Sequence, residues 1–429
     1  MSPPPPSQGA DATAAHPVTT SATPVPGAPL KLILVLGSLI ALGPLTIDMY
    51  LPALPDIEAD LLTTSAAVQL TLTGTLLGLA AGQLIVGPLS DALGRRRPLI
   101  AGTLVHVVAS LLCVVAPNVA ALGTLRVLQG VGAASASVVT LAVVRDLYDG
   151  RAAARLLSRL MLVLGVGPVL APSLGGAVLQ WTTWRGVFVV LAAAGAILTL
   201  VAYRFLPETL PVERRRSGGV AGTVASFRIL GRDGVFVGLV LVAGLSMAAL
   251  FAYVSGSSFV LQDQYGLSEQ QFAVVFGLGS IGLIAGTQVN ARLLRRYTPQ
   301  QLLLWALVGG TGASMVMLAS AVSGFGGLVG VLVPIWAVLA AAGVAMPNAP
   351  ALALSRHGEV AGTAAALLGA VRFGIGAVAA PFVGLLGNDS TAMAAIMVVS
   401  MAAAVAVLAV AVSPARLLAS ETNAVAAAD

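Results

Sequence analysis

Long uninterrupted runs of apolar residues are the feature that most limits how this chain can fold. Val187–Leu198 and Met401–Val412 contain no charged side chain, and several stretches approach or exceed the ~20 residues that a helix needs to cross a ~30 Å hydrocarbon core. Only 9% of the 429 residues are charged and the mean hydropathy is +0.96, whereas a soluble domain carries about 25% charged residues. Lipid is therefore the solvent for most of the chain.

The membrane spans are predicted to be helices. A helix satisfies its own backbone hydrogen bonds, as lipid demands, and the apolar runs lack the polar–apolar alternation of barrel strands. We predict an all-α polytopic membrane protein with twelve transmembrane helices in two six-helix halves. The predicted spans are residues 31–53, 65–87, 98–117, 119–143, 155–180, 185–206, 234–256, 270–292, 300–321, 325–349, 361–386 and 390–412.

Basic residues mark every second loop, which predicts the orientation in the membrane. One set of loops and helix ends holds Lys31 and almost all the arginines, whereas the other holds only Arg185 and is acidic. We therefore expect a multi-pass protein of the cytoplasmic membrane with both termini inside the cell. The formal net charge of +5 follows from this bias, so we expect no nucleic-acid partner. The acids of the second set are Asp56, Glu58, Asp60, Asp263, Glu269 and Asp389.

The chain divides at its longest interior loop. We predict a disordered Pro/Ala-rich tail over 1–29, an N-terminal half over 30–206, a cytoplasmic central loop over 207–233, a C-terminal half over 234–412 and a cytoplasmic tail over 413–429. The first tail has neither a basic start nor an apolar core, so we do not expect it to be a signal peptide. The halves echo each other: Gly87, Asp91 and Arg95-Arg96 have counterparts in Gly286, Asn290 and Arg295-Arg296, as internal repeats of transporters do.

Several sources of chemistry are excluded by the residues present. A Walker A loop needs a lysine after its glycines, and the single lysine, Lys31, has no such loop before it. One cysteine, Cys113, allows no intrachain disulfide and no four-cysteine metal site. We expect no metal and no cofactor. If the protein pumps, it must use an ion gradient or an ATPase on another chain; a channel is the alternative, but the sequence shows no selectivity-filter loop or re-entrant segment. His106 is predicted to be a packed helix residue, with a proton relay as the alternative.

Two segments resemble signatures of the major facilitator superfamily. Gly87-Pro88-Leu89-Ser90-Asp91-Ala92-Leu93-Gly94-Arg95-Arg96 resembles the helix 2–3 loop signature, a cytoplasmic gate. We expect Gly87 to allow close helix approach, Gly94 to make the turn and Asp91 to pair with arginines. Ala92 departs from the pattern, since the family usually has a basic residue there. Arg126-Val127-Leu128-Gln129-Gly130 resembles the helix 4 signature.

A third segment favours export over uptake. Residues 163–176 resemble the helix 5 signature of drug:proton antiporters in the same superfamily. Glycines in such a helix allow tight packing and prolines bend it. The alternative is an ordinary kinked membrane helix rich in glycine. The residues of this motif are Gly165, Gly167, Pro168, Pro172, Gly175 and Gly176.

Five more segments narrow the resemblance to the bicyclomycin/chloramphenicol resistance (Bcr/CflA) branch. They are Asp48–Pro55, Val144–Leu147, Leu206–Leu210, Phe251–Val260 and Ala361–Ala364. The resemblance covers both halves, and it implies a central cavity and drug:proton antiport. The substrates it implies are small amphipathic compounds of the chloramphenicol or bicyclomycin type. We expect a monomer.

Three charged residues inside the spans are the predicted coupling site. Asp48 is the only acid placed well inside a span, and Arg126 enters from the same side to a similar depth. Our hypothesis is that Asp48 binds the proton while Arg126 tunes its proton affinity; a static buried ion pair is the alternative. Arg372, near the middle of its span, is a candidate for a carbonyl or anionic substrate group, or a second partner of Asp48. The predicted cavity-lining residues are Tyr50, Gln129, Met247, Phe251 and Tyr253.

Two other functions are compatible with a polytopic chain. An importer of a small nutrient, either a proton symporter or a facilitator, would use the same fold, and the helix 5 motif argues against it. The second alternative is a membrane receptor that transports no substrate, and the charged residues predicted in the cavity argue against it. Both alternatives agree with the main hypothesis that the chain is not an enzyme.

Overall fold

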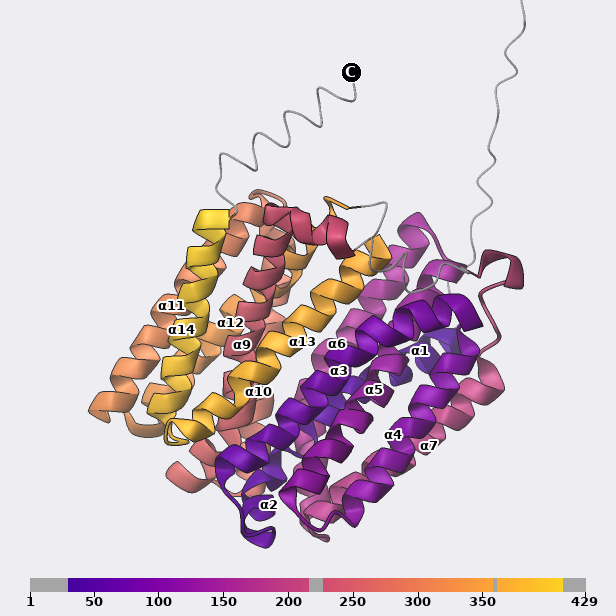
Figure 1. The fold of residues 1–429 in the computed structure, drawn as a ribbon. Coiled ribbons are helices and arrows are strands. Elements are labelled where there is room, and N and C mark those ends of the chain that lie inside the picture. The colour runs from indigo at the N-terminus through magenta and orange to yellow at the C-terminus, as the bar shows by residue number, and fades with distance from the viewer. Residues whose placement is uncertain (1–29, 216–226, 358–360, 412–429) are drawn as a thin grey trace, which may run out of the picture.

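The computed structural model describes residues 30–215, 227–357 and 361–411, and it is helical throughout, with no strand in these ranges (Figure 1). Twelve of its helical segments are long and apolar enough to cross a membrane, which confirms the predicted number of spans. The predicted tails, 1–29 and 413–429, lie outside the described residues.

The helix bounds agree with the predicted spans to within a few residues at most ends. The N-terminal half contains α1 (Leu30–Asp48), η1 (Leu51–Ala53), α2 (Leu54–Asp60), α3 (Ser65–Leu93), α4 (Arg96–Val114), α5 (Val119–Leu147), α6 (Gly150–Leu179) and α7 (Trp184–Phe205), followed by η2 (Val212–Arg214). The C-terminal half contains α9 (Gly234–Phe259), the π-helical turn η3 (Val260–Gln264), α10 (Glu269–Leu293), α11 (Pro299–Ser323), α12 (Gly327–Leu354), α13 (Ala361–Leu385) and α14 (Ser390–Ala411).

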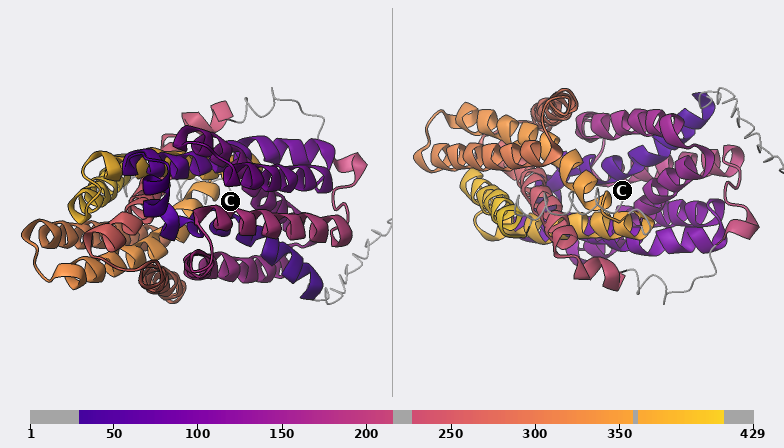
Figure 2. Two further views of the ribbon diagram at one scale, coloured as in Figure 1. Left: turned by 90° about the horizontal axis from the view of Figure 1, so that it is seen from below. Right: turned by 90° about the horizontal axis from the view of Figure 1, so that it is seen from above.

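The two halves lie side by side as separate helix bundles (Figures 1 and 2). Their main contacts are two helix pairs, α3 with α13 and α6 with α10. Thr73 of α3 donates a hydrogen bond to the Ala377 carbonyl of α13 at 2.8 Å. The interface between the halves is therefore built on four helices.

Polar residues fix where the helices begin and turn. Thr64 and Asn118 cap α3 and α5 through their side chains, and Ser268 and Thr298 form capping boxes at α10 and α11, which satisfies amide groups that the first turn leaves free. Gly94 takes φ +89° between α3 and α4, a conformation that glycine adopts without steric cost. Its predicted role in the turn is confirmed.

The first span is broken, although we expected one helix over 31–53. The α-helix ends at Asp48, residues 49–50 form a turn, and η1 and α2 continue to Asp60. Pro52 and Pro55 have no amide hydrogen, so the carbonyl groups of Asp48 and Leu51 lose their donors four residues ahead. The Leu51 carbonyl accepts instead from the Leu54 amide and from Ser258 Oγ of the other half. The prolines were visible in the sequence; their effect on the helix was not predicted.

Close packing of α3 against α5 depends on glycines, but not on Gly87. A Cβ at Gly74, Gly78 or Gly82 would collide with α5, whereas a Cβ at Gly87 would meet nothing within 4 Å. The expectation that Gly87 allows close helix approach is wrong in this structure. Close approach is made nearer the middle of α3, and the α3 end at Gly87 is free of such contact.

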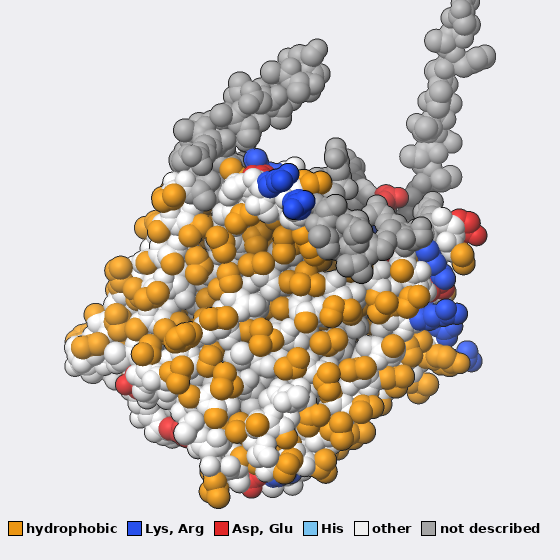
Figure 3. Space-filling view, viewed as in Figure 1, with side chains coloured by type: hydrophobic (Ala, Val, Ile, Leu, Met, Phe, Trp, Pro, Cys, Tyr) orange, Lys and Arg blue, Asp and Glu red, His pale blue; other side chains and the backbone are white. Residues whose placement is uncertain are grey.

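Exposed apolar side chains cover the sides of the molecule, and charges collect at its two ends (Figure 3). We call the end that holds Arg95, Arg145, Arg204, Arg292 and Arg356 the basic end, and the end that holds Asp56, Asp60, Asp263, Glu269 and Asp389 the acidic end. Apolar sides between polar ends are what a bilayer requires. The chain is therefore a multi-pass membrane protein.

Hydrogen bonds join the two halves at the acidic end. Gln262 Nε2 donates to the Pro52 carbonyl at 3.1 Å, and Gln69 Nε2 donates to Asn388 Oδ1 at 2.8 Å. At the basic end, the ion pairs of Arg95 with Asp91 and Asp146 and that of Arg356 with Asp233 do not join the two bundles. The acidic end is therefore the closed end in this structure.

Candidate functional site

Asp48 stands at the break in the first span, as the last residue of α1. It is 5% exposed, and no hydrogen bond or ion pair of its carboxylate is found among the described residues. The break that holds it contacts the other half, because the Leu51 carbonyl accepts a hydrogen bond from Ser258 Oγ of α9. The structure thus places an unpaired acid of one half close to a point where the two halves are in contact.

Arg126 of α5 is fully buried and is held by α1 and by its own helix. Its Nη1 donates to the Thr46 carbonyl at 3.0 Å and to Gln129 Oε1. The Thr46 carbonyl lies near the end of α1, where the helix dipole is negative, so a guanidinium there stabilises the helix end. Arg126 thus braces the helix that carries Asp48.

Aromatic rings account for the rest of the Arg126 environment. The guanidinium carbon lies 3.9 Å from the ring centre of Tyr50 and 5.6 Å from that of Phe188, and its Nε and Nη2 have no hydrogen-bond partner in the described structure. Cation–π attraction is strongest for such desolvated cations. Arg126 forms no ion pair with Asp48 in the residues described; tuning of Asp48 by Arg126 stays a prediction.

His106 and Ser110 of α4 extend this polar cluster. Thr46 Oγ1 donates its only hydrogen to the Leu42 carbonyl at 2.6 Å, so in the 2.9 Å contact with His106 Nε2 the histidine is the donor. Ser110 Oγ accepts from Gln129 Nε2 at 2.7 Å. His106 is fully buried, which agrees with a packed helix residue.

Arg372 of α13 is the third predicted coupling residue, and no hydrogen bond or ion pair of its guanidinium is found among the described residues. Two glycines flank it on α13 and lie against other helices. A Cβ at Gly369 would overlap Gln83 of α3, and one at Gly376 would overlap Phe251 of α9. Arg372 therefore lies where α3, α9 and α13 meet, and it does not pair with Asp48.

The five predicted cavity-lining residues are all buried. Phe251 contacts Phe373, and Tyr253 stacks on Phe276 with ring centres 5.1 Å apart. A hollow of about 580 Å³ that the structure contains lies instead between α3 and α5, lined by residues such as Leu70, Gly74 and Val127, and includes none of the five. Their role in a cavity stays a prediction. The residues are Tyr50, Gln129, Met247, Phe251 and Tyr253.

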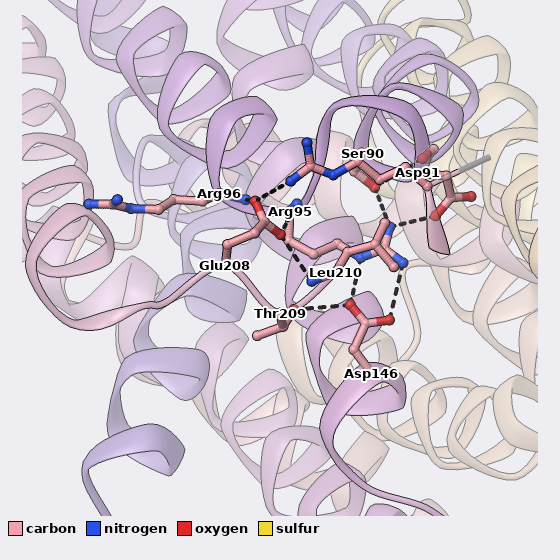
Figure 4. A network of polar contacts seen from close by, with 10 residues as sticks. Ser90, Asp91, Arg95, Arg96, Asp146, Glu208, Thr209 and Leu210 are labelled. Atoms are coloured by element: carbon pink, nitrogen blue, oxygen red, sulfur yellow. Dashed lines mark hydrogen bonds and ion pairs between the residues drawn. The ribbon is translucent and has the colours of Figure 1, made fainter. Parts of the chain in front are cut away.

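The gate motif forms an ion-pair network at the basic end (Figure 4). Arg95 binds Asp146 of α5 through two nitrogens, at 2.7 and 3.2 Å, and donates to Asp91 through Nη1. Thr209, just after α7, donates to Asp146 at 3.0 Å. Asp91 pairs with an arginine as predicted, and Arg95 joins the ends of α3, α5 and α7. Asp146 and Thr209 lie in two of the segments that carry the family resemblance, but nothing in the sequence predicts their part in this network.

Glu208, which follows α7, caps the start of α4. Its carboxylate accepts from the backbone amides of Arg95, at 2.7 Å, and Arg96, at 3.3 Å. Burial raises the pKa of the Glu208 carboxyl, but hydrogen bonds from the amides of Arg95, Leu210 and Arg96 and the charge of Arg215 outweigh burial and lower that pKa below its ordinary value. Arg96 itself donates to the Tyr203 carbonyl of α7.

We expect Glu208→Gln to destabilise the purified protein by about 1–2 kcal/mol near neutral pH, because a charged cap is lost. The stabilisation is complete above the ordinary glutamate pKa of about 4.3 and is lost as the pH falls through the lower folded-state pKa. Melting temperatures measured against pH should therefore converge for wild type and variant in acid. The control is Glu213→Gln, which changes an exposed acid nearby; a Glu208→Gln difference that persists unchanged in acid would contradict the capping role.

The C-terminal half uses different chemistry at the corresponding place. Asn348 Nδ2 of α12 donates to Asn290 Oδ1 of α10 at 2.7 Å, and both side chains are buried. A separate cluster lies nearby, in which Asp233 caps α9 and binds Arg356 at 2.9 Å and His357 at 3.0 Å. The predicted echo between the halves is therefore real in position, but an amide pair replaces the ionic pair.

The helix 5 motif lies in α6, between α1 and α10. Pro172 has no amide hydrogen, so the Pro168 carbonyl lacks its usual donor. It lies 3.3 Å from Ser280 Oγ of α10, whose one hydrogen it shares with the Phe276 carbonyl at 3.2 Å. The Gly176 carbonyl accepts from Gln270 of α10 at 3.5 Å. The proline and glycine of the motif thus expose carbonyl groups to the other half.

Comparison with known proteins extends these observations. The family model described as Major Facilitator Superfamily matches residues 36–381. An uncharacterized MFS-type transporter, YdgK of Bacillus subtilis, is 38% identical over 86% of this chain and 92% of its own length. A bicyclomycin resistance protein homolog of Haemophilus influenzae is 30% identical over 86% and 94%, and a chloramphenicol resistance protein of Pseudomonas aeruginosa is 31% identical over 80% and 81%.

Solved structures share the fold at low sequence identity. A mutant of the nucleoside transporter NupG superposes with a TM-score of 0.71 at 12% identity, covering 89% of this chain and 99% of its own. A D-xylose-proton symporter gives 0.67 at 16% identity, covering 87% and 96%. These likenesses concern the fold alone.

Proposed function

We propose, since the chain belongs to the major facilitator superfamily of membrane transporters, that it exports drug-like molecules in exchange for protons by alternating access. The observation that carries the proposal is Asp48, a buried carboxyl group without a cationic partner among the described residues, at the break in the first span. Ionisable groups inside membrane proteins are costly and mark ion or proton pathways. Broken helices are also where secondary transporters build their binding sites.

The position of Asp48 supports a role in coupling the two halves. It is the last residue of α1, and three residues further on the Leu51 carbonyl accepts a hydrogen bond from Ser258 Oγ of α9, so the break that holds Asp48 contacts both of the halves that move in alternating access. A proton bound there would change contacts that the halves make with each other. Proton and drug would compete if the ionised carboxylate also accepts a hydrogen bond from the drug.

Substrate chemistry is proposed from the relatives and from Arg372. Relatives named for bicyclomycin and chloramphenicol resistance favour small amphipathic drugs. Arg372, which has no protein partner among the described residues, can donate hydrogen bonds to a carbonyl or nitro group of such a drug. We assign the proton to Asp48 and the oxygen-bearing end of the drug to Arg372.

The orientation proposed here puts the basic end in the cytoplasm, because short cytoplasmic loops carry an excess of Lys and Arg. The closed acidic end then faces outward, and the structure represents a state in which the outer side is sealed. Localisation in the cytoplasmic membrane follows from the same assignment. No resident cofactor is needed, because the proton gradient supplies the energy.

We expect cells that lack other efflux systems to accumulate less labelled chloramphenicol when they express this chain. The reason is that the inward proton gradient drives the drug outward. The measurement compares accumulation with and without a protonophore, at equal protein in the membrane, and the protonophore should restore accumulation to the level of cells without the protein.

Two outcomes would count against the proposal. Lower accumulation that persists in the presence of the protonophore would remove proton coupling, since export would not depend on the gradient. Unchanged accumulation of chloramphenicol and of bicyclomycin by well-expressed protein would remove drug export. An importer would instead raise accumulation of its substrate, so the direction of net flux separates the two functions.

A further inference from the structure

The glycines of the helix 5 motif fall into two groups according to what a Cβ atom would meet. At Gly175 a Cβ would overlap the Met49 carbonyl oxygen, and at Gly167 it would lie 2.6 Å from Pro44 Cβ. Both neighbours belong to the first span. At Gly165 and Gly176 a Cβ would meet only α10, at 3.6 Å and 3.4 Å. The motif therefore packs against two neighbours, the first span and α10, through different glycines.

The two contacts with the first span lie on either side of Asp48. Pro44 is four residues before the acid, and Met49 follows it directly in the turn where α1 ends. In this turn the Ala53 amide binds the Tyr50 carbonyl at 3.0 Å rather than that of Met49, as a continuous α-helix would require. The Met49 carbonyl is thus turned out of the helix and lies against the α6 backbone at Gly175.

We propose that Gly175, assisted by Gly167, positions Asp48 by seating the break of the first span against α6. A side chain at position 175 would push the Met49 carbonyl away and turn the neighbouring carboxyl group. Gly175 does not touch the proton or the drug, so it is a positioning residue. The inference deepens the proposed function, because it rests on Asp48 as the proton site.

Helix α6 packs both against the segment that holds Asp48 and against α10 of the other half. α6 contacts α1 at Gly167 and the turn after α1 at Gly175, and it contacts α10 through the Pro168 carbonyl, which lies 3.3 Å from Ser280 Oγ. A change in the α1 turn therefore reaches an interface helix through one packed neighbour.

The test measures Asp48 itself and needs no substrate. A hydrophobic carbodiimide reacts with a protonated carboxyl group to give an O-acylisourea, which rearranges to a stable N-acylurea. Modification of the Asp48 peptide in the full-length protein, followed by mass spectrometry as a function of pH, gives the midpoint of Asp48 protonation. Asp48→Asn serves as the unreactive reference for the peptide.

We expect Gly175→Ala to move this midpoint by at least about one pH unit, a tenfold change in proton affinity. Gly176→Ala, one residue away on the same helix, meets α10 at an ordinary contact distance and should leave the midpoint within about 0.3 units. A folded Gly175→Ala protein with the wild-type midpoint would overturn the proposal, as would an equal shift in Gly176→Ala.

A second pair decides the question if Gly175→Ala does not fold. Gly167→Ala should shift the midpoint, and Pro44→Gly should reverse that shift because it removes the Cβ that the new methyl group meets. Gly165→Ala is the matched control. A Gly167→Ala protein with the wild-type midpoint overturns the proposal. Drug transport is measured separately. A failure of drug export would therefore leave the carbodiimide result interpretable, and an unchanged carbodiimide midpoint would leave the transport result interpretable.

Discussion

Asp48→Asn should remove the pH dependence of drug binding and abolish export driven by the proton gradient. In the wild type, proton and drug compete, so raising the pH should strengthen chloramphenicol binding by at least about tenfold, within the range typical of coupled ligands. Asparagine cannot bind the proton, and the variant should bind weakly and equally at all pH values. Equilibrium binding to purified protein and accumulation in cells measure the two effects.

The control for this variant is Asp60→Asn. Asp60 is an acid of the same span, but its side chain binds Arg185 and Trp184 of α7 at the acidic end. These partners belong to the same half as Asp60. Its replacement should leave the pH dependence of binding intact. Gradient-driven export that survives Asp48→Asn in correctly inserted protein would move the proton site away from Asp48.

Arg95→Ala should be the most destabilising change at the basic end. The Arg95 side chain is 8% exposed and that of its partner Asp146 is 13% exposed, and removal of one partner of a buried pair costs about 3–5 kcal/mol. Asp91 would lose the same partner, which adds to the repulsion between the two acids. Thermal unfolding of the purified protein measures the loss.

Arg97→Ala is the matched control, because Arg97 is exposed on the first turn of α4 and surface substitutions change stability by about 0.5 kcal/mol or less. In a double-mutant cycle, Arg95→Ala with Asp146→Ala should cost less than the sum of the single changes. Equal melting temperatures for Arg95→Ala and Arg97→Ala would show that the network contributes nothing to stability.

Much of the fold was predictable because lipid leaves few choices. Each apolar run had to become a helix, and the distribution of arginines required an even number of spans. The turn at Gly94 and the pairing of Asp91 with an arginine were also predictable, since both depend on residues within a short segment. Local chemistry and the length of an apolar run are visible in one sequence.

Contacts between distant segments were not predictable. The sequence pattern places Asp48 and Arg126 at similar depth in the membrane, which suggests an ion pair. The depth of a residue does not give the direction in which its side chain points. Arg126 turns instead to a backbone carbonyl and the ring of Tyr50. Likewise, Glu208 caps a helix whose first residue, Arg96, is far away along the chain, and no periodicity marks such a contact.

The difference between the two halves at the basic end has a consequence for how each responds to salt. Dissolved ions screen charge interactions over about 8 Å at physiological ionic strength and over about 3 Å at 1 M. The Arg95–Asp91 pair is ionic and the Asp91 side chain is 44% exposed, whereas Asn290 and Asn348 are joined by a hydrogen bond between neutral, buried side chains. Concentrated salt should therefore loosen the helix ends of the N-terminal half and spare this contact in the C-terminal half, so that the two copies of the repeat differ in their sensitivity to the salinity of the surrounding water.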